Sequence, residues 1–532
     1  MPSESNIASL VASRAKTHPD LDVLTFEDNA AEETRTYLQL WQNGQRVADA
    51  LARSGMRRGD RFALLMQNHP EFVEAMVASA ILGTVFVPID PRTKGDKLSF
   101  LLRDAGCQGV ICGDYALDNL LECADSVPSL RWVFCLGEVA ARAGTLAVRS
   151  LAEVTRQAQV PDLPIAVECD RDPMQILYTS GTTGDPKGIV IRYARFAFVS
   201  KQGELVLGYR ANDRPYTGLS LTHGNAQFIT LAPSLYMGLR AVISRKFTKS
   251  RLWQIARRYG CTTFSLLGGM FTAIYGEAPR PDDADNPVRF VISAGMPKAL
   301  WQDFARRFDV QIFEFYAAVE GGMLVNPNGE GPVGSCGRVI PGLIAKIVDD
   351  DGRELGPNMP GEIWFRPSDG SPAAVEYFND PDASMRKTDG GWLHSGDVVI
   401  MDEQGWVYYQ YRKGGGIRHN GDFINPALLE KIIAEHPEVT DVSVFGVPAS
   451  SGAPGEMDIV AAVVPVAMNR FNPQDVFVWC REHVEGNTVP SFIQVVEELP
   501  KTASEKVQPR FLRQMFEART VPIHRELSTA SS

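Results

Sequence analysis

Residues that could bind a polyphosphate are concentrated in one short segment, Tyr178-Thr-Ser-Gly-Thr-Thr-Gly-Asp-Pro-Lys-Gly188. Glycines let a backbone turn sharply and point its N–H groups toward an anion. The hydroxyl groups add further donors, and the lysine adds a positive charge. We therefore expect a phosphate-cradling loop, with Thr179 and Lys187 as catalytic residues and with Ser180, Gly181, Thr182, Thr183 and Gly184 as binding residues.

The spacing of this loop differs from that of other nucleotide-binding loops. The GK[ST] ending of a Walker loop is absent. Gly329-Glu-Gly-Pro-Val-Gly334 fits GxGxxG, but no strand precedes it and a proline stands where the helix should begin, so we interpret it as a coincidence. The alternative for the loop at 178–188 is an ordinary turn rich in Ser, Thr and Gly, and such a turn rarely combines so many hydroxyls with Pro-Lys-Gly.

The segment at 178–188 resembles the signature loop of the acyl-adenylate-forming (AMP-binding) superfamily, which includes acyl-CoA synthetases, luciferases and peptide-synthetase adenylation domains. The resemblance extends from about Thr36 to Leu512, with the motifs in the family's order. It implies a large N-terminal domain and a small mobile C-terminal domain. It also implies ATP, Mg²⁺ and coenzyme A as cofactors or co-substrates.

A second segment, Phe313 to Gly321, ends a predicted strand and combines an aromatic residue with a carboxylate. The resemblance implies that Tyr316 stacks on adenine and that Glu320 holds Mg²⁺, a cation that prefers oxygen ligands. This chain has Val319 where the family usually has Thr, so one hydroxyl contact to the nucleotide is lost. We expect three neighbours in the segment to contact the nucleotide as well: Glu314, Phe315 and Ala317.

The other nucleotide and acid contacts come from shorter segments. The ribose motif is matched by Gly391 to Asp397, which implies that Asp397 binds the ribose hydroxyls, together with Arg412. The segment Ser293-Ala-Gly-Met-Pro297 implies that Ala294 and Gly295 lie beside the adenine and the acid. His223, in Leu219 to Gln227, is expected to orient or gate the acid, because a carboxylate attacks the α-phosphate without a general base.

The C-terminal segment Leu499 to Val507 resembles the family's terminal Pro-x-Thr-x-x-x-Lys motif and places Lys506 in the catalytic lysine position. An ammonium there would offset the repulsion between the carboxylate and the α-phosphate. The resemblance also implies a hinge at Gly415 and a pantetheine channel at Gly421. A swivel at the hinge would clear the site for a thiol after adenylation.

The elements that must position these residues indicate an α/β protein with two or three domains. Strands at 61–66, 84–89, 238–244, 263–267, 288–293 and 311–315 alternate with helices at 47–54, 70–82, 250–259 and 298–308, which indicates βαβ units and mostly parallel sheets. Short strands after about residue 331 predict a small antiparallel β unit. A helix and strands from 426 onward, with a final strand at 491–496, predict a separate α+β domain. We therefore expect an N-terminal domain at 1–411 with a β subdomain at about 331–411, a hinge at 412–416 and a mobile domain at 417–532.

Composition narrows the function classes further. The formal net charge of -11, with no basic cluster, argues against a nucleic acid partner. The eight cysteines form no CxxC or CxxH cluster, which is typical of a reducing compartment. The N-terminus has no signal-peptide pattern, and no apolar run reaches about 20 residues. We expect a cytoplasmic enzyme without a membrane span, and leave a homodimer open.

The most concrete hypothesis is an AMP-forming acid–CoA ligase whose partners are a small carboxylic acid and CoA. Glu314 to Gly321 and Arg412 to Gly421 are most similar to the fatty-acid-transporter and carnitine–CoA ligase branches, which favours an aliphatic or alicyclic acid. One alternative is an adenylating enzyme that loads a carrier protein or another acceptor. Another is a non-catalytic binder of acid or nucleotide, motivated by Val319 and Gly415.

Overall fold

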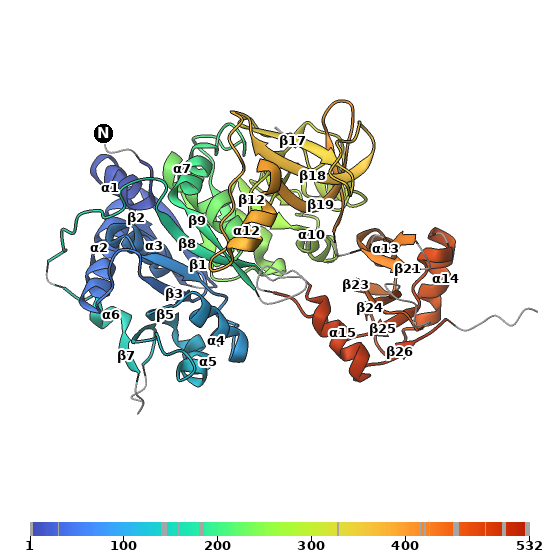
Figure 1. The fold of residues 1–532 in the computed structure, drawn as a ribbon, viewed down its shortest axis with the longest axis horizontal. Coiled ribbons are helices and arrows are strands. Elements are labelled where there is room, and N and C mark those ends of the chain that lie inside the picture. The colour runs from blue at the N-terminus through green and yellow to red at the C-terminus, as the bar shows by residue number, and fades with distance from the viewer. Residues whose placement is uncertain are drawn as a thin grey trace, which may run out of the picture.

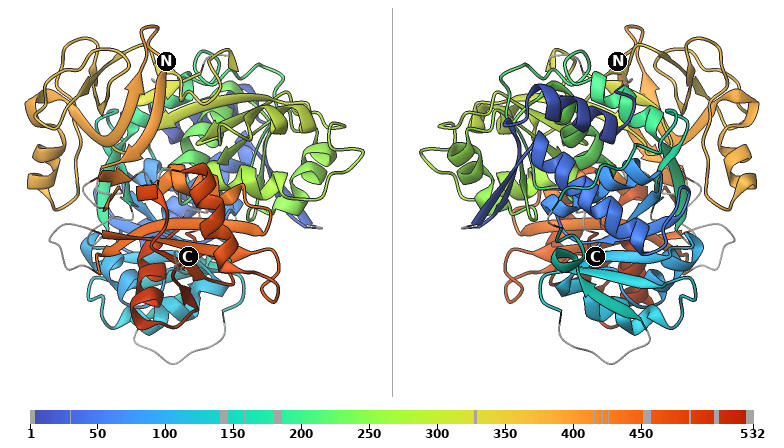
Figure 2. Two further views of the ribbon diagram at one scale, coloured as in Figure 1. Left: turned by 90° about the vertical axis from the view of Figure 1, so that its right-hand side faces the viewer. Right: turned by 90° about the vertical axis from the view of Figure 1, so that its left-hand side faces the viewer.

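The computed structural model describes residues 4–29, 31–139, 146–157, 159–179, 186–326, 329–413, 416–419, 422–424, 426–450, 457–484, 486–502 and 507–526. It confirms the expected α/β architecture, with a large N-terminal part that holds two sheets and a small C-terminal part (Figure 1). The C-terminal part, coloured orange-red to red, lies to one side of the larger part in Figure 1 and therefore in front of it in the left-hand view of Figure 2.

A seven-stranded sheet of order β7-β6-β5-β3-β4-β8-β9 forms the first layer, and all its pairs are parallel except the β8–β9 hairpin. The segment that resembles the signature loop therefore joins the two strands of an antiparallel hairpin at the sheet edge. Helices α4 and α5 cover one face, and α2 and α3 cover the other. The bounds are β3 Arg61–Leu65, β4 Val85–Pro88, β5 Gly109–Gly113, β6 Trp132–Leu136, β7 Ala147–Ser150, β8 Pro173–Thr179, β9 Lys187–Arg192, α2 Tyr37–Arg53, α3 Pro70–Leu82, α4 Gly95–Asp104, α5 Asp114–Ala124 and α6 Leu151–Val154.

A nine-stranded sheet forms the second layer, in the order β16-β15-β14-β13-β12-β10-β11-β1-β2, and its central strands are parallel. Antiparallel strands occur at both edges. The bounds are β1 Asp22–Asp28, β2 Ala31–Thr36, β10 Pro215–Thr217, β11 Ala241–Ser244, β12 Thr263–Leu267, β13 Phe290–Ala294, β14 Gln311–Ala317, β15 Met323–Val325 and β16 Arg338–Val339. Its helices are α1 Ile7–Thr17, α7 Tyr193–Lys201, η1 Ala226–Leu231, α8 Ala232–Met237, η2 Lys249–Arg251, α9 Leu252–Tyr259, α10 Gly268–Tyr275 and α11 Trp301–Phe308.

The two sheets share one hydrophobic core, in which α3 is buried around almost its whole circumference. Pro70 starts this helix at a position that needs no backbone donor, and Gly83 ends it with a φ of 70°, in the left-handed region that favours glycine. A helix that is apolar on all sides must lie inside the protein. The sequence expectation of a helix at 70–82 is therefore confirmed, and the structure adds that the helix lies in the core that both sheets share.

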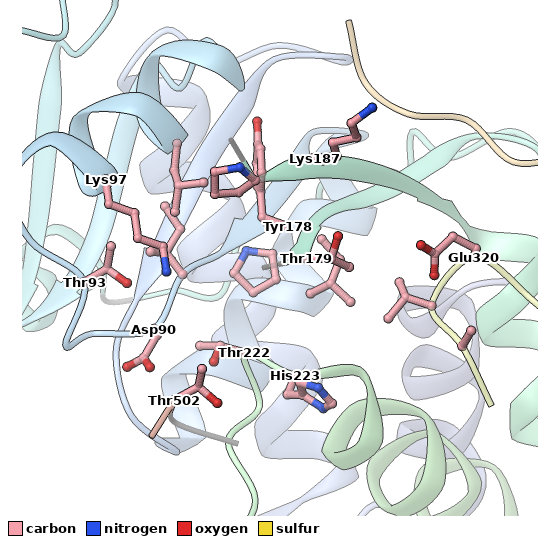
Figure 3. A pocket seen from close by; sticks show the side chains of 18 of the residues that line it. Asp90, Thr93, Lys97, Tyr178, Thr179, Lys187, Thr222, His223, Glu320 and Thr502 are labelled. Atoms are coloured by element: carbon pink, nitrogen blue, oxygen red, sulfur yellow. The ribbon is translucent and has the colours of Figure 1, made fainter. Parts of the chain in front are cut away.

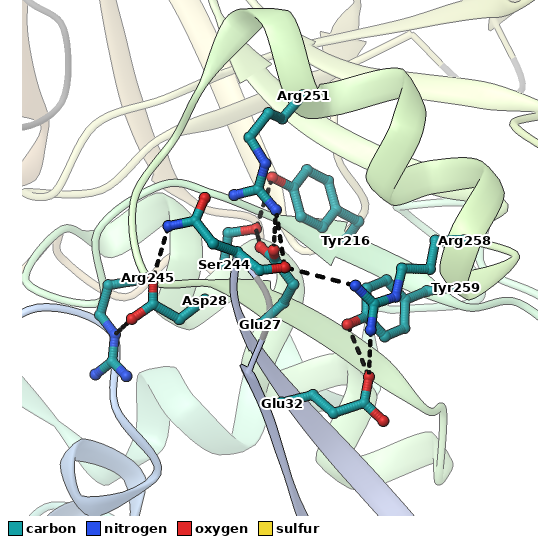
Figure 4. Close-up of polar contacts among 10 residues, drawn as sticks. Glu27, Asp28, Glu32, Tyr216, Ser244, Arg245, Arg251, Arg258 and Tyr259 are labelled. Carbon is teal, nitrogen blue, oxygen red and sulfur yellow. Dashed lines mark hydrogen bonds and ion pairs between the residues drawn. The ribbon is translucent and has the colours of Figure 1, made fainter.

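A buried carboxylate ties the N-terminal hairpin β1–β2 to the second sheet (Figure 4). Glu27 is 2% exposed, accepts a hydrogen bond of 2.7 Å from Ser244 and forms an ion pair with Arg251. Ser244 in turn accepts from the hydroxyl of Tyr216 at 3.0 Å. Since an unpaired buried carboxylate is costly, these contacts fix the hairpin at the sheet edge.

The antiparallel β unit follows as expected, with the strands in the order β17-β18-β19-β20. The C-terminal part has a four-stranded sheet of order β23-β24-β25-β26 and its own hydrophobic cores. The expectation that the strand near 491–496 is the last element is wrong, because α15 and β26 follow it: Leu512 of α15 is fully buried against that sheet. The bounds are β17 Leu343–Val348, β18 Pro360–Pro367, α12 Pro381–Lys387, η4 Asp389–Gly391, β19 Leu393–Met401, β20 Val407–Arg412, β21 Ile417–His419, β22 Asp422–Ile424, α13 Pro426–Ala434, β23 Val439–Pro448, β24 Met457–Pro465, α14 Pro473–His483, η5 Gly486–Thr488, β25 Phe492–Val495, α15 Pro509–Ala518 and β26 Ile523–His524.

The domain limits at 411 and 416 stay predictions. Among the described residues, no helix combines the length and the apolar character that crossing a bilayer requires.

Candidate active site

A cavity of about 1420 Å³ lies where the two sheets, the β unit and the C-terminal part meet. Its wall combines residues of α4, the ends of β8 and β9, the loop after β14, strand β20 and the start of α15. Figure 3 shows Thr179, Lys187, His223 and Glu320 around this space, and in this view Thr502 of the C-terminal part is drawn beside Asp90 and Thr222. The volume exceeds that of a typical pocket for one small ligand, so there is room for a nucleotide and a second molecule.

Tyr316, Asp397 and Arg412 form one polar cluster on the cavity wall. The hydroxyl of Tyr316 donates to Asp397 Oδ2 at 2.6 Å, and Arg412 Nη1 lies 3.4 Å from Asp397 Oδ1. The register of β19 and β20 pairs Asp397 directly with Arg412, so the sheet itself sets their positions. Burial raises the pKa of Asp397, while the guanidinium opposes that rise. Three residues expected at adenine and ribose are thus adjacent.

Glu320 and Lys187 line the cavity, and Tyr377 and Asp380 contact them. The hydroxyl of Tyr377 donates to Glu320 Oε1 at 3.1 Å. Lys187 Nζ lies 2.9 Å from Asp380 Oδ2 and 5.5 Å from the centre of the Tyr377 ring. Burial, and next the charge of Glu320, raise the pKa of Tyr377, which keeps it a hydrogen-bond donor. The carboxylate of Glu320 and the ammonium of Lys187 therefore both lie beside the side chain of Tyr377.

A magnesium ion fits this arrangement only as a partner of a substrate phosphate. No group of three His, Cys, Asp or Glu side chains suited to a metal occurs among the described residues. Glu320 contributes one carboxylate, and its second oxygen has no hydrogen bond within the described part of the chain. Mg²⁺ commonly takes one or two carboxylates together with phosphate oxygens and waters, so a single carboxylate is sufficient.

Gly295 forms a tight turn whose backbone is held from beneath by Glu314. Its φ is 93°, and its N–H donates to Glu314 Oε1 at 2.6 Å, while the N–H of Met296 donates at 3.2 Å. Glu314 is 4% exposed, and burial raises its pKa to about 7. Phe315 is 5% exposed and belongs to a hydrophobic cluster. These two side chains shape the wall, whereas Ala294 and Ala317 line the cavity.

His223 and Thr222 line the cavity, as does Ala294. The backbone N–H of Asn225 donates to His223 Nδ1 at 3.3 Å, which leaves the ring proton of the neutral imidazole on Nε2. Thr179 ends β8 directly opposite Lys187 in the hairpin register, and both line the cavity. The structure therefore brings the expected acid-side and phosphate-side residues to one space.

Eight candidate residues lie outside the described residues. Thr179 and Pro186, on either side of 180–185, line the cavity, and so do Thr502, directly before 503–506, and Gln508, two residues after them. The expectations for the candidates themselves stay predictions. These candidates are Ser180, Gly181, Thr182, Thr183, Gly184, Gly415, Gly421 and Lys506.

Several charged residues of the site were missed by the sequence analysis. Arg195, on α7, donates through Nη1 to the carbonyl oxygen of Val319, and burial lowers its pKa while Glu320 opposes this. Lys387 donates to the carbonyl oxygen of Ser395 at 3.1 Å. Neither lies in a recognisable motif, so only the fold reveals them.

Two further cations that line the cavity, Lys97 of α4 and Arg510 of α15, were also missed. Burial lowers the pKa of Lys97, and the charge of Arg510 lowers it further. The two cations therefore lie close enough to repel each other. They lie in two helices that are far apart in the sequence, so no local motif indicates them.

Comparison with known proteins gives two family matches. Residues 11–370 match the AMP-binding enzyme model, and residues 428–506 match the AMP-binding enzyme C-terminal domain model. The long-chain-fatty-acid–CoA ligase FadD13 of Mycobacterium tuberculosis is 30% identical, over 97% of this chain and 99% of its own length. The crotonobetaine/carnitine–CoA ligase of Salmonella paratyphi A is 27% identical, over 96% and 99%. The structure of the anthranilate CoA ligase AuaEII in complex with anthranoyl-AMP has a TM-score of 0.84 at 24% identity, over 97% of this chain and 98% of that one, which supports the fold.

Proposed function

Because the chain belongs to the AMP-binding enzyme family, we propose that it is an ATP-dependent, AMP-forming acid–CoA ligase. In the first step, the acid's carboxylate attacks the α-phosphorus of ATP, and the bond to pyrophosphate breaks. In the second step, the thiol of CoA loses its proton and attacks the acyl carbonyl, and AMP leaves. The supporting observation is that the Tyr316–Asp397–Arg412 cluster and the Glu320–Tyr377–Lys187 group face one cavity.

The residues divide the first step between binding and charge stabilisation. We propose that Tyr316 stacks on adenine, that Asp397 and Arg412 take the ribose hydroxyls, and that Lys187 contacts the phosphates. Mg²⁺, held by Glu320 and the phosphates, would supply positive charge to the leaving pyrophosphate. Lys506 would bring an ammonium between the carboxylate and the α-phosphate, where it favours the charge distribution of the transition state.

The second step requires the C-terminal part to move, so that a thiol can replace the lysine. The chain is anchored just before the proposed hinge. The backbone N–H of Lys413 donates to the carbonyl oxygen of Gly396 at 2.6 Å. The side-chain ammonium of Lys413 lies 3.1 Å from the carboxylate of Glu362 and 2.9 Å from that of Asp350. The chain is therefore attached to the β unit as far as Lys413, which supports a pivot two residues later, at Gly415. We propose that Gly421 then borders the pantetheine channel.

The test is release of pyrophosphate across a panel of carboxylic acids, with and without CoA. We expect acid-dependent release from ATP, and CoA-dependent formation of AMP and thioester. Release without thioester would show that another acceptor, such as a carrier protein, takes the acyl group. ATP binding without release for any acid would contradict the proposal and favour a non-catalytic binder.

Two further proposals concern the setting of the enzyme. All eight cysteines are free thiols, which agrees with a cytoplasmic location. A homodimer stays a prediction, and light scattering of the purified chain would test it.

A further inference from the structure

Helix α12 carries a cation that no motif of the sequence indicates. Lys387, the last residue of α12, lines the cavity, and so does Asp380, the N-cap of the same helix. Ala383, which lies between them in the sequence, is 6% exposed. Residues three and four positions apart are neighbours on the surface of a helix, so these three residues share one face. The face of α12 that carries Lys387 is therefore the one turned toward the cavity.

The two ends of α12 contact two different parts of the candidate site. At its start, Asp380 forms the ion pair with Lys187, which we place at the phosphates. At its end, Lys387 Nζ donates to the carbonyl oxygen of Ser395 at 3.1 Å. Ser395 is two residues before Asp397, and its hydroxyl oxygen accepts from the backbone N–H of Asp397 at 2.9 Å. The helix thus extends from the proposed phosphate contacts to the proposed ribose contacts.

Lys387 lies near both carboxylates that we assign to the nucleotide. Burial lowers the pKa of Lys387, and the negative charge of Glu320 is the largest effect that opposes this lowering. The charge of Asp397 also opposes it. Charges act on one another mainly within about 10 Å in salt solution, so all three groups belong to one region of the cavity. ATP with its ribose at Asp397 and its metal at Glu320 would carry the α-phosphate between these carboxylates.

Lys387 has no carboxylate partner in the part of the chain that the structure describes. The cations that line the cavity on β9, α12 and β20 are Lys187, Lys387 and Arg412. Lys187 lies 2.9 Å from Asp380, and Arg412 lies 3.4 Å from Asp397. The hydrogen bond of Lys387 to a carbonyl oxygen uses one of its three ammonium protons, and the charge is not neutralised. Its ammonium is therefore available to an anionic group in the cavity.

We propose that Lys387 binds the α-phosphate of ATP and keeps this contact in the acyl-adenylate and in AMP. This inference rests on the proposed ligase function. The contact offsets negative charge on the phosphate that the acid's carboxylate attacks. Because α12 precedes the proposed hinge, Lys387 stays at the phosphate when Lys506 moves away. It then stabilises the AMP that leaves in the second step.

The experiment measures the dissociation constants of AMP and adenosine by isothermal titration calorimetry, in buffer without Mg²⁺. The two ligands differ only in the phosphate. Lys387→Met should weaken AMP binding about 10-fold, the factor for one hydrogen bond to a charged group, and leave adenosine binding almost unchanged. Unchanged AMP affinity would overturn the inference. Equal weakening of both ligands would also overturn it, because Lys387 would then only position Asp397 through Ser395.

Two further variants separate charge from position. Arg386→Met is the matched control, because it removes a cation from the same turn of α12. Arg386 is exposed and is not part of the cavity wall, so both constants should stay near their wild-type values. An AMP loss as large as that of Lys387→Met would overturn the inference in favour of a general charge effect. Lys387→Gln keeps a donor for Ser395 without the charge, and should weaken AMP binding as much as Lys387→Met; it decides the question if the methionine variant does not fold.

The inference and the ligase function fail in different ways. Selective loss of AMP affinity in Lys387→Met, together with no pyrophosphate release for any acid, would support the phosphate contact and reject the ligase function. Selective loss of AMP affinity together with acid-dependent release would support both. A wild-type chain that binds neither AMP nor adenosine would reject both.

Discussion

Replacing Glu314 by glutamine should make the protein more stable at alkaline pH and leave its stability almost unchanged at acidic pH. Glu314 lies beneath the Gly295 turn, 4% exposed, and accepts backbone N–H groups at 2.6 and 3.2 Å. These donors favour the carboxylate, but burial is the larger effect and raises its pKa to about 7. Glutamine has the shape of the protonated acid and cannot ionise.

The magnitude follows from the change in pKa on folding. The pKa of Glu314 rises from 4.5 to about 7 on folding. Each pKa unit corresponds to about 1.4 kcal/mol, so ionisation of Glu314 lowers the free energy of unfolding by about 3 kcal/mol. Because the folded state holds the proton more tightly, this stability is fully present below pH 4.5 and is lost as pH rises through about 7. Glu314→Gln should therefore gain up to about 3 kcal/mol at pH 8.5 and little at pH 5.

The assay is urea unfolding of the wild-type and variant chains at both pH values, followed by tryptophan fluorescence. Burial also raises the pKa of Glu71 and Glu430 to about 7, so the wild-type protein should lose stability with rising pH for three reasons. Those two carboxyls are present in both proteins and cancel in the difference. An equal effect of the substitution at pH 5 and 8.5, or destabilisation at pH 8.5, would refute the reasoning.

Three other substitutions test the site and its scaffold. Lys506→Ala should lower acid-dependent pyrophosphate release by about 100-fold or more with nearly unchanged ATP affinity, because a transition-state charge is lost; equal losses in both quantities would argue for a binding role. Arg251→Met should destabilise the protein by about 3 kcal/mol in urea unfolding, since it leaves Glu27 buried without a cation, and the double variant with Glu27→Gln should lose less. Lys413→Met removes the contacts to Glu362 at 3.1 Å and to Asp350 at 2.9 Å and should slow CoA-dependent thioester formation about 5-fold, a loss of about 1 kcal/mol; a stopped-flow rate equal to wild type would show that the anchor does not hold the pivot.

Much of the scaffold could be predicted from local pattern. Helix α3 and strand β12 have the predicted bounds, because each is a short apolar run ended by glycine, proline or a polar turn. Helix α15 was missed after the strand at 491–496. Its buried face rests on Leu512 with Met515 and Phe516, and this pattern became clear only against the sheet that it covers.

Some residues of the candidate site could likewise be predicted from the sequence, and others could not. Tyr316 and Asp397 were expected from motifs, and their contact follows from strands that the pattern also indicates. The role of Glu314 could not be anticipated, because its neighbour Gly295 is nineteen positions away and the carboxylate meets it only through the β13–β14 pairing. The position of Arg195 could not be anticipated either, because the neighbouring sequence does not distinguish an arginine buried beneath a loop from one on the surface.

Strand β2 has a consequence for the behaviour of the protein in concentrated solution. It is the last strand of the nine-stranded sheet, and one side of its backbone has no strand to pair with in that sheet. Such an edge can recruit a strand from another molecule. Here Glu32 and Glu33 are about half exposed on the strand and form ion pairs with Arg258 and Arg35, so a second copy approaching edge to edge would meet charged side chains that it would have to desolvate. The same hairpin that Glu27 holds in place therefore hinders intermolecular sheet growth, and replacing these charged residues by apolar ones should increase aggregation.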